Sequence, residues 1–168
     1  QNIRLFGGLT VWQNLWVARN STEDIRSQSI LRRWLGSGTA LKKEIETMLE
    51  FSNLADKADV LASNLAFGEQ RRLELARAIA AKPRLLLLDE PAAGMNQAEV
   101  AELEQRIRSL REQGITILLV EHVMQLVMGV TDRIAVLNFG SKIAEGSPND
   151  IQENTAVQEA YLGHSDQG

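Results

Sequence analysis

The amino-acid sequence predicts an α/β protein in which a helical subdomain precedes a mostly parallel sheet with flanking helices. Two observations predict this order. Over the first half of the 168 residues, apolar side chains recur at the three- and four-residue spacing of helices, whereas continuous aliphatic runs begin at Leu85. Three such runs alternate with helix-like segments, which is typical of strand–helix–strand units.

The first half of the chain is predicted to be helical almost throughout. Thr10 and Gln13 have the spacing of a capping box and precede a first helix, and apolar residues at helical spacing over 41–49 predict a second. Strong helix formers fill residues 68–81, until a proline ends the run. Residues 20–39 are polar, and we expect a mixture of helix and loop there.

The pattern changes where the first aliphatic run begins. The uninterrupted run from Leu85 to Leu88 is typical of a parallel strand that is buried on both faces. Asn96 and Glu99 then form a second capping box, and Gly114 suits the end of the helix that this box begins. A second strand is predicted over residues 115–120.

The remaining elements are shorter. We expect a helix over residues 124–128 and a third strand over residues 133–137, which with right-handed crossovers would form one edge of a parallel sheet. Residues 138–141 have the composition of a hairpin turn. One short helix is expected over residues 150–161.

Composition limits the classes of function. The net charge is −4, from 22 acidic and 18 basic residues, so the broad positive field of a nucleic-acid-binding protein is missing. There is no cysteine, which excludes disulfides and thiolate metal sites and fits a reducing compartment. No apolar run approaches the roughly 18 residues of a membrane span. The chain opens on Gln1 rather than Met, and we expect it to be part of a longer protein.

Two strand ends carry side chains suited to phosphate chemistry. Asp89 can hold Mg²⁺, usually through water, while Glu90 can orient and deprotonate a second water. A buried strand that leads into an acidic turn would produce the same pattern. His122 follows the next strand and could donate a hydrogen bond to a phosphoryl oxygen, although a lone histidine is often structural. The other histidine, His164, is near the end of the chain, so no metal-binding pair is expected.

A glycine also stands at the expected start of the helix over residues 68–81. Gly68 would leave backbone N–H groups free for an anion and would let a phosphate approach closely. An ordinary glycine N-cap followed by solvated arginines is the alternative interpretation.

The order of these motifs resembles the ATP-binding cassette family. The stretches LAFGEQRRLELARAIA, LLLLDEPAAGMN and ILLVEH follow one another as they do in that family. QNIRLF, EPAAGMN and EHVMQLVMGVTDRIAVLNFGSKIAEG are most similar to the ATPases of branched-chain amino acid importers. The resemblance implies the C-terminal part of a P-loop NTPase cassette.

The resemblance also implies a role for individual residues. Gln1 would be the Q-loop glutamine that contacts Mg²⁺ and senses the γ-phosphate, Asp89 the metal aspartate, Glu90 the catalytic base and His122 the switch histidine. The nucleotide would be ATP, bound with Mg²⁺. Further nucleotide-binding positions are implied in the signature loop and the D-loop: Leu65, Ala66, Phe67, Gly68, Glu69, Gly94 and Asn96.

Several positions depart from the family pattern. Ala66 stands where most family members have Ser, Asn96 replaces the usual D-loop Asp, and Val123 stands where importers of this kind tend to have Asp. No G-x-x-x-x-G-K-[ST] occurs, because the glycines at 36 and 38 have the wrong spacing to the lysines that follow. The phosphate loop is therefore expected before Gln1, and this chain alone is expected to be inactive.

As a member of this family the chain would power transport by ATP-driven dimer closure. It would divide into a helical subdomain (1–80), a core part with the catalytic motifs (81–146) and a C-terminal helix and tail (147–168). Its partners would be a second ATPase subunit, transmembrane permeases and, indirectly, a solute-binding protein, with no nucleic acid. Residues 4–6 would contact the permease, or Leu5 and Phe6 would simply be core residues. The location would be peripheral, at the cytoplasmic face of the inner membrane.

Two alternatives share these motifs. A lipopolysaccharide-export ATPase is a similar motor whose partners extract lipid. A soluble cassette protein acting in translation or DNA repair would usually add a second cassette, a coiled coil or a basic extension, none of which occurs in these residues.

Overall fold

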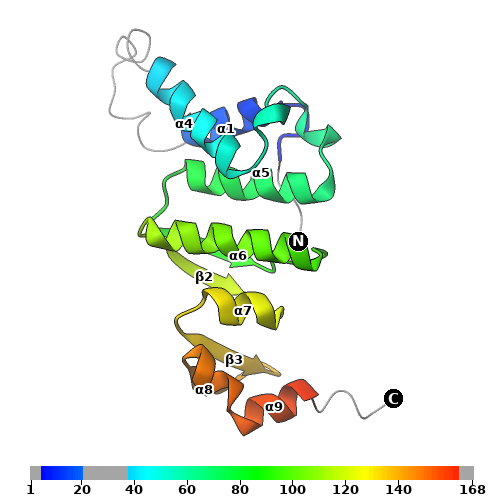
Figure 1. Ribbon diagram of the computed structural model, residues 1–168, viewed down its shortest axis with the longest axis vertical. Coiled ribbons are helices and arrows are strands. Elements are labelled where there is room, and N and C mark those ends of the chain that lie inside the picture. Colours follow the sequence, from blue (N-terminus) through cyan, green and yellow to red (C-terminus); the bar gives the residue numbers. More distant parts are fainter. Residues whose placement is uncertain (1–4, 21–37, 163–168) are drawn as a thin grey trace.

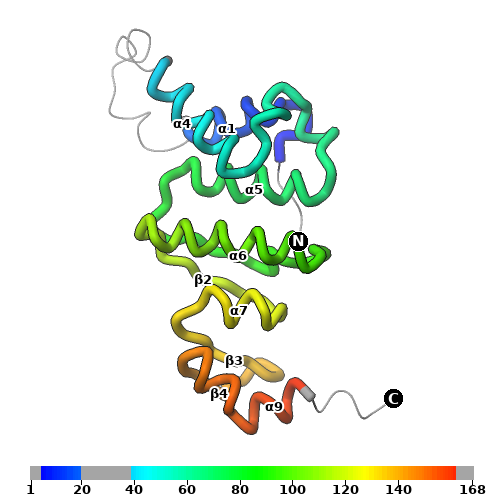
Figure 2. The backbone as a smooth tube through the Cα atoms, in the orientation of Figure 1, coloured from blue at the N-terminus to red at the C-terminus, as the bar shows by residue number. Residues whose placement is uncertain are grey.

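The computed structural model of the chain describes residues 5–20 and 38–162. The described part is elongated, with packed helices at one end, parallel strands and their covering helices in the middle, and a hairpin with short helices at the other end (Figure 1). The chain passes through these layers in sequence order, from the blue end to the red end (Figure 2).

The helical end is built around a single apolar cluster. Its packing brings together helices α1, α4 and α5, as their spacing of apolar residues predicts. The predicted first capping box is confirmed, because the Thr10 N–H donates to Gln13 Oε1 at 2.9 Å and the Gln13 N–H donates to Thr10 Oγ1 at 3.2 Å. The elements are α1 (Val11–Asn20), α4 (Gly38–Phe51), η1 (Ala55–Lys57), η2 (Ala62–Asn64) and α5 (Phe67–Ala80).

A buried amide fixes the segment that enters this end. The side chain of Asn14 is fully buried in α1. Its Oδ1 accepts the N–H of Phe6 at 3.0 Å, and its Nδ2 donates to the carbonyls of Phe6 and Thr10, each at 3.0 Å. Phe6 itself is 49% exposed, and the guanidinium of Arg77 lies 4.9 Å from its ring centre. Leu5 packs against the core, while Arg4 lies outside the described residues.

Two parallel strands and a covering helix form the middle of the molecule. Strand β1 (Leu85–Asp89) pairs with β2 (Thr116–Val120), and α6 (Gln97–Glu112) connects them. The predicted capping box at the start of α6 is confirmed: the Glu99 N–H donates to Asn96 Oδ1 at 3.1 Å and the Asn96 N–H to Glu99 Oε2 at 2.9 Å. Gly114 ends the helix with a φ of 85°.

The expectation that β1 is buried on both faces is wrong for the described structure. Leu86 is buried and Leu88 packs with the same core, together with Val100, Leu103 and Ile107 of α6. The opposite face has no cover among residues 5–20 and 38–162. The side chains on that face are 53% to 65% exposed and comprise Leu85, Leu87, Leu118 and Val120.

The third predicted strand exists but does not belong to the parallel sheet. After α7 (Met124–Val130), β3 (Ile134–Asn138) pairs with β4 (Ser141–Gly146) in a separate antiparallel hairpin. The turn is the predicted one, and Phe139 and Gly140 both adopt positive φ, as a tight two-residue hairpin requires. The hairpin uses one edge of β3, and among the described residues β3 has no parallel neighbour, so the expected β-α-β-α-β edge is not formed there.

The last predicted helix is divided in two. Helix α8 (Pro148–Gln152) begins with a capping box between Ser147 and Asp150, and α9 (Thr155–Leu162) begins after Asn154. The break is stabilised because the Val157 N–H donates to Asn154 Oδ1 at 3.2 Å. Both helices pack against β4.

A third apolar cluster joins the helical end to the sheet. Ile79 of α5, Leu86 of β1 and Leu110 of α6 are buried together. Beside them the Arg106 Nε donates to the carbonyl of Phe51 at 3.2 Å, so that α6 also contacts the end of α4. Of the helices in the described ranges, none is long and apolar enough to cross a membrane.

We predict that Asn14→Ala lowers the free energy of unfolding by about 2–3 kcal/mol, because it leaves the buried N–H and C=O groups of Phe6 without their partner. Urea titration monitored by circular dichroism measures this loss. Gln105→Ala is the matched control, since Gln105 is exposed on α6, and it should change stability by less than about 0.5 kcal/mol. Equal effects of the two substitutions would contradict the prediction.

Candidate functional site

The first half of the site lies at the carboxyl end of the parallel strands. Asp89 and Val120 are paired in register at the end of the ladder. The N–H of Glu90 continues the ladder by donating to the carbonyl of Val120 at 2.8 Å. Because the strands are parallel, the residues that follow them leave the sheet at one edge. The structure therefore places Asp89, Glu90 and His122 at the same edge of the sheet.

Glu90 and His122 face one another across this edge. The backbone of Glu90 adopts a φ of 45°, a left-handed conformation that is uncommon for a side-chain-bearing residue and that turns the chain sharply after β1. His122 Nδ1 lies 3.6 Å from Glu90 Oε1, within ion-pair distance but too far for a strong hydrogen bond. The His122 side chain is 70% exposed, so most of the ring is open to a ligand.

Sequence reasoning missed one residue at this edge, Glu121. Its side chain is completely buried, although it is a carboxylate between an aliphatic strand and an exposed histidine. Oε1 accepts the N–H of Ala92 at 2.9 Å, and Oε2 accepts the N–H of His122 at 2.8 Å. The available signal was an acidic residue directly after a buried strand, the same signal that singled out Asp89.

The second half of the site lies at the start of α5, beside the start of α6. Ala66 is the N-cap of α5 and has no side-chain acceptor. Among the described residues, no acceptor meets the N–H groups of Phe67 and Gly68. A Cβ added at Gly94 would lie 3.7 Å from the Phe67 ring, so the start of α5 and the loop before α6 lie side by side.

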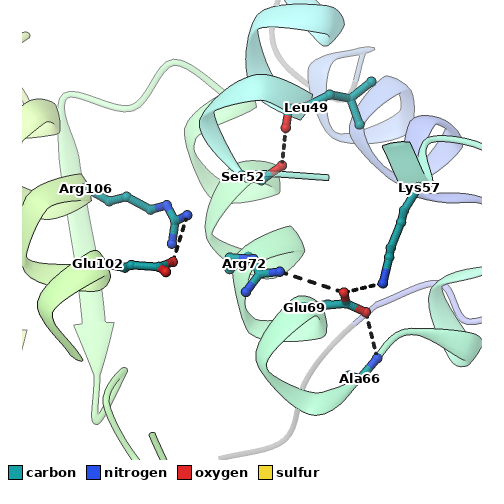
Figure 3. Close-up of polar contacts among 8 residues, drawn as sticks. All are labelled: Leu49, Ser52, Lys57, Ala66, Glu69, Arg72, Glu102 and Arg106. Carbon is teal, nitrogen blue, oxygen red and sulfur yellow. Dashed lines mark hydrogen bonds and ion pairs between the residues drawn. The ribbon is translucent and has the colours of Figure 1, made fainter. Parts of the chain in front are cut away.

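Glu69 bonds to its own chain rather than facing outward (Figure 3). Its Oε2 accepts the Ala66 N–H at 3.0 Å, Oε1 contacts the ammonium group of Lys57, and Arg72 lies 3.8 Å away. The Lys57 hydrogen bond, opposed by burial and assisted by the Ala66 N–H, lowers the pKa of Glu69. The side chain thus holds the loop between η2 and α5 in place.

Other predicted positions contribute differently. Leu65 is buried in the helical core, so only its backbone can face a ligand. The Asn96 side chain is used in the cap of α6. Gln1 lies outside the described residues.

The residues at the strand edge fit Mg²⁺ only as part of a nucleotide complex. Asp89 is exposed at the end of β1 and offers one carboxylate. In the part of the chain that the structure describes, no group of three His, Cys, Asp or Glu side chains could hold a metal ion by itself. Mg²⁺ is typically held by one or two carboxylates together with substrate phosphates and water, which matches this arrangement.

Comparison with known families decides what these motifs belong to. A family model described as "ABC transporter" matches residues 1–93, more than half of the 168 residues. The chain belongs to the ABC transporter family. A second model, described as "Branched-chain amino acid ATP-binding cassette transporter", matches residues 141–167 of the cassette. The resemblance found in the sequence is confirmed.

Curated relatives agree with this assignment. The cassette is 44% identical to the high-affinity branched-chain amino acid transport ATP-binding protein LivG of Escherichia coli (strain K12), over 98% of this chain and 66% of that protein. It is 41% identical to BraF of Pseudomonas aeruginosa, with the same coverage. A lipopolysaccharide export system ATP-binding protein, LptB of Haemophilus influenzae, is 31% identical over 97% of the chain and 63% of LptB. The chain thus spans just under two thirds of the length of these relatives.

Solved structures show the same fold. The ADP conformation of MJ1267, an ATP-binding cassette of an ABC transporter, matches with a TM-score of 0.71 and 26% identity, over 94% of this chain and 64% of that one. The cbiO1 protein of Clostridium perfringens has a TM-score of 0.72 at 21% identity, over 96% of this chain and 59% of that one. The α/β cassette fold predicted from the sequence is confirmed.

We predict that Glu69→Gln lowers the free energy of unfolding by about 1–2 kcal/mol at pH 7, because the amide loses the charge that Lys57 and Arg72 stabilise. The folded-state pKa of Glu69 is lowered, so this contribution is complete above the usual glutamate pKa and is lost as the pH falls through the lower folded value. The difference between wild type and variant should therefore shrink below about pH 4. Urea titrations at pH 7 and pH 3.5 measure it, and a constant difference would contradict the assignment.

Proposed function

We propose that a subunit containing this cassette binds ATP with Mg²⁺ and hydrolyses it to power import of branched-chain amino acids or related small solutes. The observation that carries the proposal is the strand edge, where Asp89, Glu90 and His122 meet. The identity of 44% to LivG over 98% of the chain supports the choice of solute.

Each residue at the edge has a chemical task in this proposal. Asp89 is the ligand for Mg²⁺, which would supply charge neutralisation to the phosphate oxygens when bound. Glu90 orients a water and accepts its proton, since its carboxylate is half-buried and fixed by the turn after β1. His122, exposed and beside Glu90, donates a hydrogen bond to a phosphoryl oxygen.

The exposed start of α5 supports a site shared between two subunits. The free N–H groups of Phe67 and Gly68 lie at the positive end of a helix dipole, which favours an anion. In the proposed dimer they bind the γ-phosphate of the nucleotide held by the partner, so ATP holds the two subunits together. Closure would move the helical end against transmembrane permeases, with the subunit peripheral at the cytoplasmic face of the membrane and a solute-binding protein acting indirectly.

The phosphate-cradling G-x-x-x-x-G-K-[ST] loop does not occur in these 168 residues. We therefore expect hydrolysis from the complete subunit rather than from this chain alone. The bare apolar face of β1 and β2 is consistent with this, because a surface of exposed leucines is normally covered.

Lipid export is the second candidate among transport functions. It is favoured by the 31% identity to LptB but opposed by the higher identity to LivG and BraF. A soluble role in translation or DNA repair has no supporting feature in the described residues.

We predict that Glu90→Gln in the complete subunit lowers kcat by about 10²- to 10⁴-fold, the usual contribution of a general base. The amide keeps the shape of the side chain but cannot accept the proton of the water. ATP binding should persist and an ATP-bound dimer should accumulate, as steady-state hydrolysis and size-exclusion chromatography with ATP would show. A kcat within a few-fold of wild type would remove Glu90 from the role of base and make His122 the next candidate.

We predict that Ala66→Asp abolishes ATP-driven dimerisation and hydrolysis in the complete subunit while leaving α5 at least as stable. Asp is a good N-cap at this extended position, worth about 1 kcal/mol, yet it places negative charge where the partner's γ-phosphate would approach. A substitution at Gly68 is less clean, because a Cβ there would lie 3.0 Å from Glu99 Oε1 of the same chain. Ala66→Ser is the matched control and should keep its activity.

Mixing subunits tests whether the site is shared. A dimer of one Ala66→Asp subunit and one Glu90→Gln subunit would have one composite site with both changes and one with neither. Regained hydrolysis in the mixture, with none in either parent, supports the shared site. Full activity of Ala66→Asp alone would rule out this role for the start of α5.

A further inference from the structure

We propose that Glu121 is a positioning residue that sets the geometry between Glu90 and His122, an inference that rests on the proposed function. Its side chain is completely buried and hydrogen-bonded to two backbone amides. One amide belongs to Ala92, two residues after Glu90, and the other to His122. A single carboxylate therefore connects the loop that carries Glu90 to the loop that carries His122.

Because Glu121 is buried, losing either of its two hydrogen bonds would be costly. A carboxylate that leaves water must recover its solvation from hydrogen bonds or charges within the protein. Oε1 accepts the Ala92 N–H at 2.9 Å and Oε2 accepts the His122 N–H at 2.8 Å, so both oxygens are engaged by short bonds to an ionised group. Displacing either loop would break one of these two hydrogen bonds and leave the buried carboxylate with only the other. The two loops are thereby held at one separation.

The same carboxylate also lies beside the imidazole. Glu121 Oε2 is 3.4 Å from His122 Nδ1, and Glu90 Oε1 is 3.6 Å from the same nitrogen. Two carboxylates on one side of the ring favour an orientation with Nδ1 toward the protein. This leaves Nε2, on the opposite side of the imidazole, as the atom available to a phosphoryl oxygen. Glu121 thus acts on both groups without touching the nucleotide itself.

The alternative is that Glu121 only stabilises the fold. The two roles differ in how Glu121 couples to Glu90. The proposed role is to set the spacing between Glu90 and His122, so its effect should largely disappear when the Glu90 carboxylate, one of the two groups being spaced, is removed. A purely structural role would lower activity by the same factor in either background.

The test uses the complete subunit and the substitution Glu121→Gln, which keeps the size of the side chain. The amide can accept from only one of the two backbone N–H groups, because its NH₂ group is a donor. We expect kcat to fall by about 10- to 100-fold, the usual effect of a small misplacement of reacting groups. The dissociation constant for ATP should stay within about two-fold, since Glu121 makes no contact with the nucleotide in this proposal. In a Glu90→Gln background, single-turnover hydrolysis should change by less than about three-fold.

Asp150→Asn is the matched control. Asp150 also accepts a backbone N–H, that of Ser147 at 2.8 Å, but it lies in the cap of α8 and not at the strand edge. This substitution should lower the melting temperature without lowering kcat. If Glu121→Gln yields no folded subunit, Glu121→Asp carries the same test, because the shorter side chain cannot reach both amides.

The outcomes separate this inference from the proposed function. If the wild-type subunit does not hydrolyse ATP, or if Glu90→Gln has no effect, the proposed function fails. If hydrolysis depends on Glu90 but kcat of Glu121→Gln or Glu121→Asp stays within two-fold of wild type, only the positioning role is overturned. An equal loss in the wild-type and Glu90→Gln backgrounds would also overturn it. A loss confined to the wild-type background supports it.

Discussion

The register of β1 against β2 is the constraint on which the strand-edge half of the candidate site depends. Because Asp89 pairs with Val120, both strands end side by side, and the residues that follow them leave the sheet at the same edge. A slip of one residue would turn Leu86 and Leu88 away from the core and would move Glu90 away from His122. The apolar contacts that α6 makes with one face of the strands therefore hold the register and, through it, the positions of the acidic and imidazole groups.

Sequence patterns predicted the elements better than their assembly. Capping boxes and helical spacing located α1 and α6, because caps are local interactions between residues three apart. The hairpin of β3 was predicted from its turn and is confirmed, whereas its expected place beside the parallel strands is not found among the described residues, since pairing of that kind depends on residues far apart in sequence. Likewise, a run of leucines predicts an apolar environment on both faces, but it does not identify what covers each face.

In the candidate site, too, local sequence patterns were informative and long-range contacts were not predictable. Asp89, Glu90 and His122 could be named as candidates from the sequence because each lies at, or within two residues of, the end of an aliphatic run. The burial of Glu121 could not, because its partner Ala92 is 29 residues away in the chain. Glu69 was expected to face a nucleotide, whereas Lys57 and Arg72 bind it within the helical end. Long-range partners, which only the fold reveals, decide whether an acidic side chain faces a ligand or supports a loop.

The two halves of the proposed site differ in charge, and this difference supports the proposal that they bind a nucleotide together. The strand edge carries the carboxylates of Asp89 and Glu90, which would repel the phosphates of ATP unless cations intervene. The start of α5 has the opposite character, with free N–H groups at the positive end of a helix. A nucleotide between them must bring Mg²⁺ to the carboxylates and present its γ-phosphate to a helix start. In the proposed function, the acidic edge thus makes nucleotide binding depend on Mg²⁺ and on donors from outside this edge, and Glu90 takes a proton from water rather than holding the ligand.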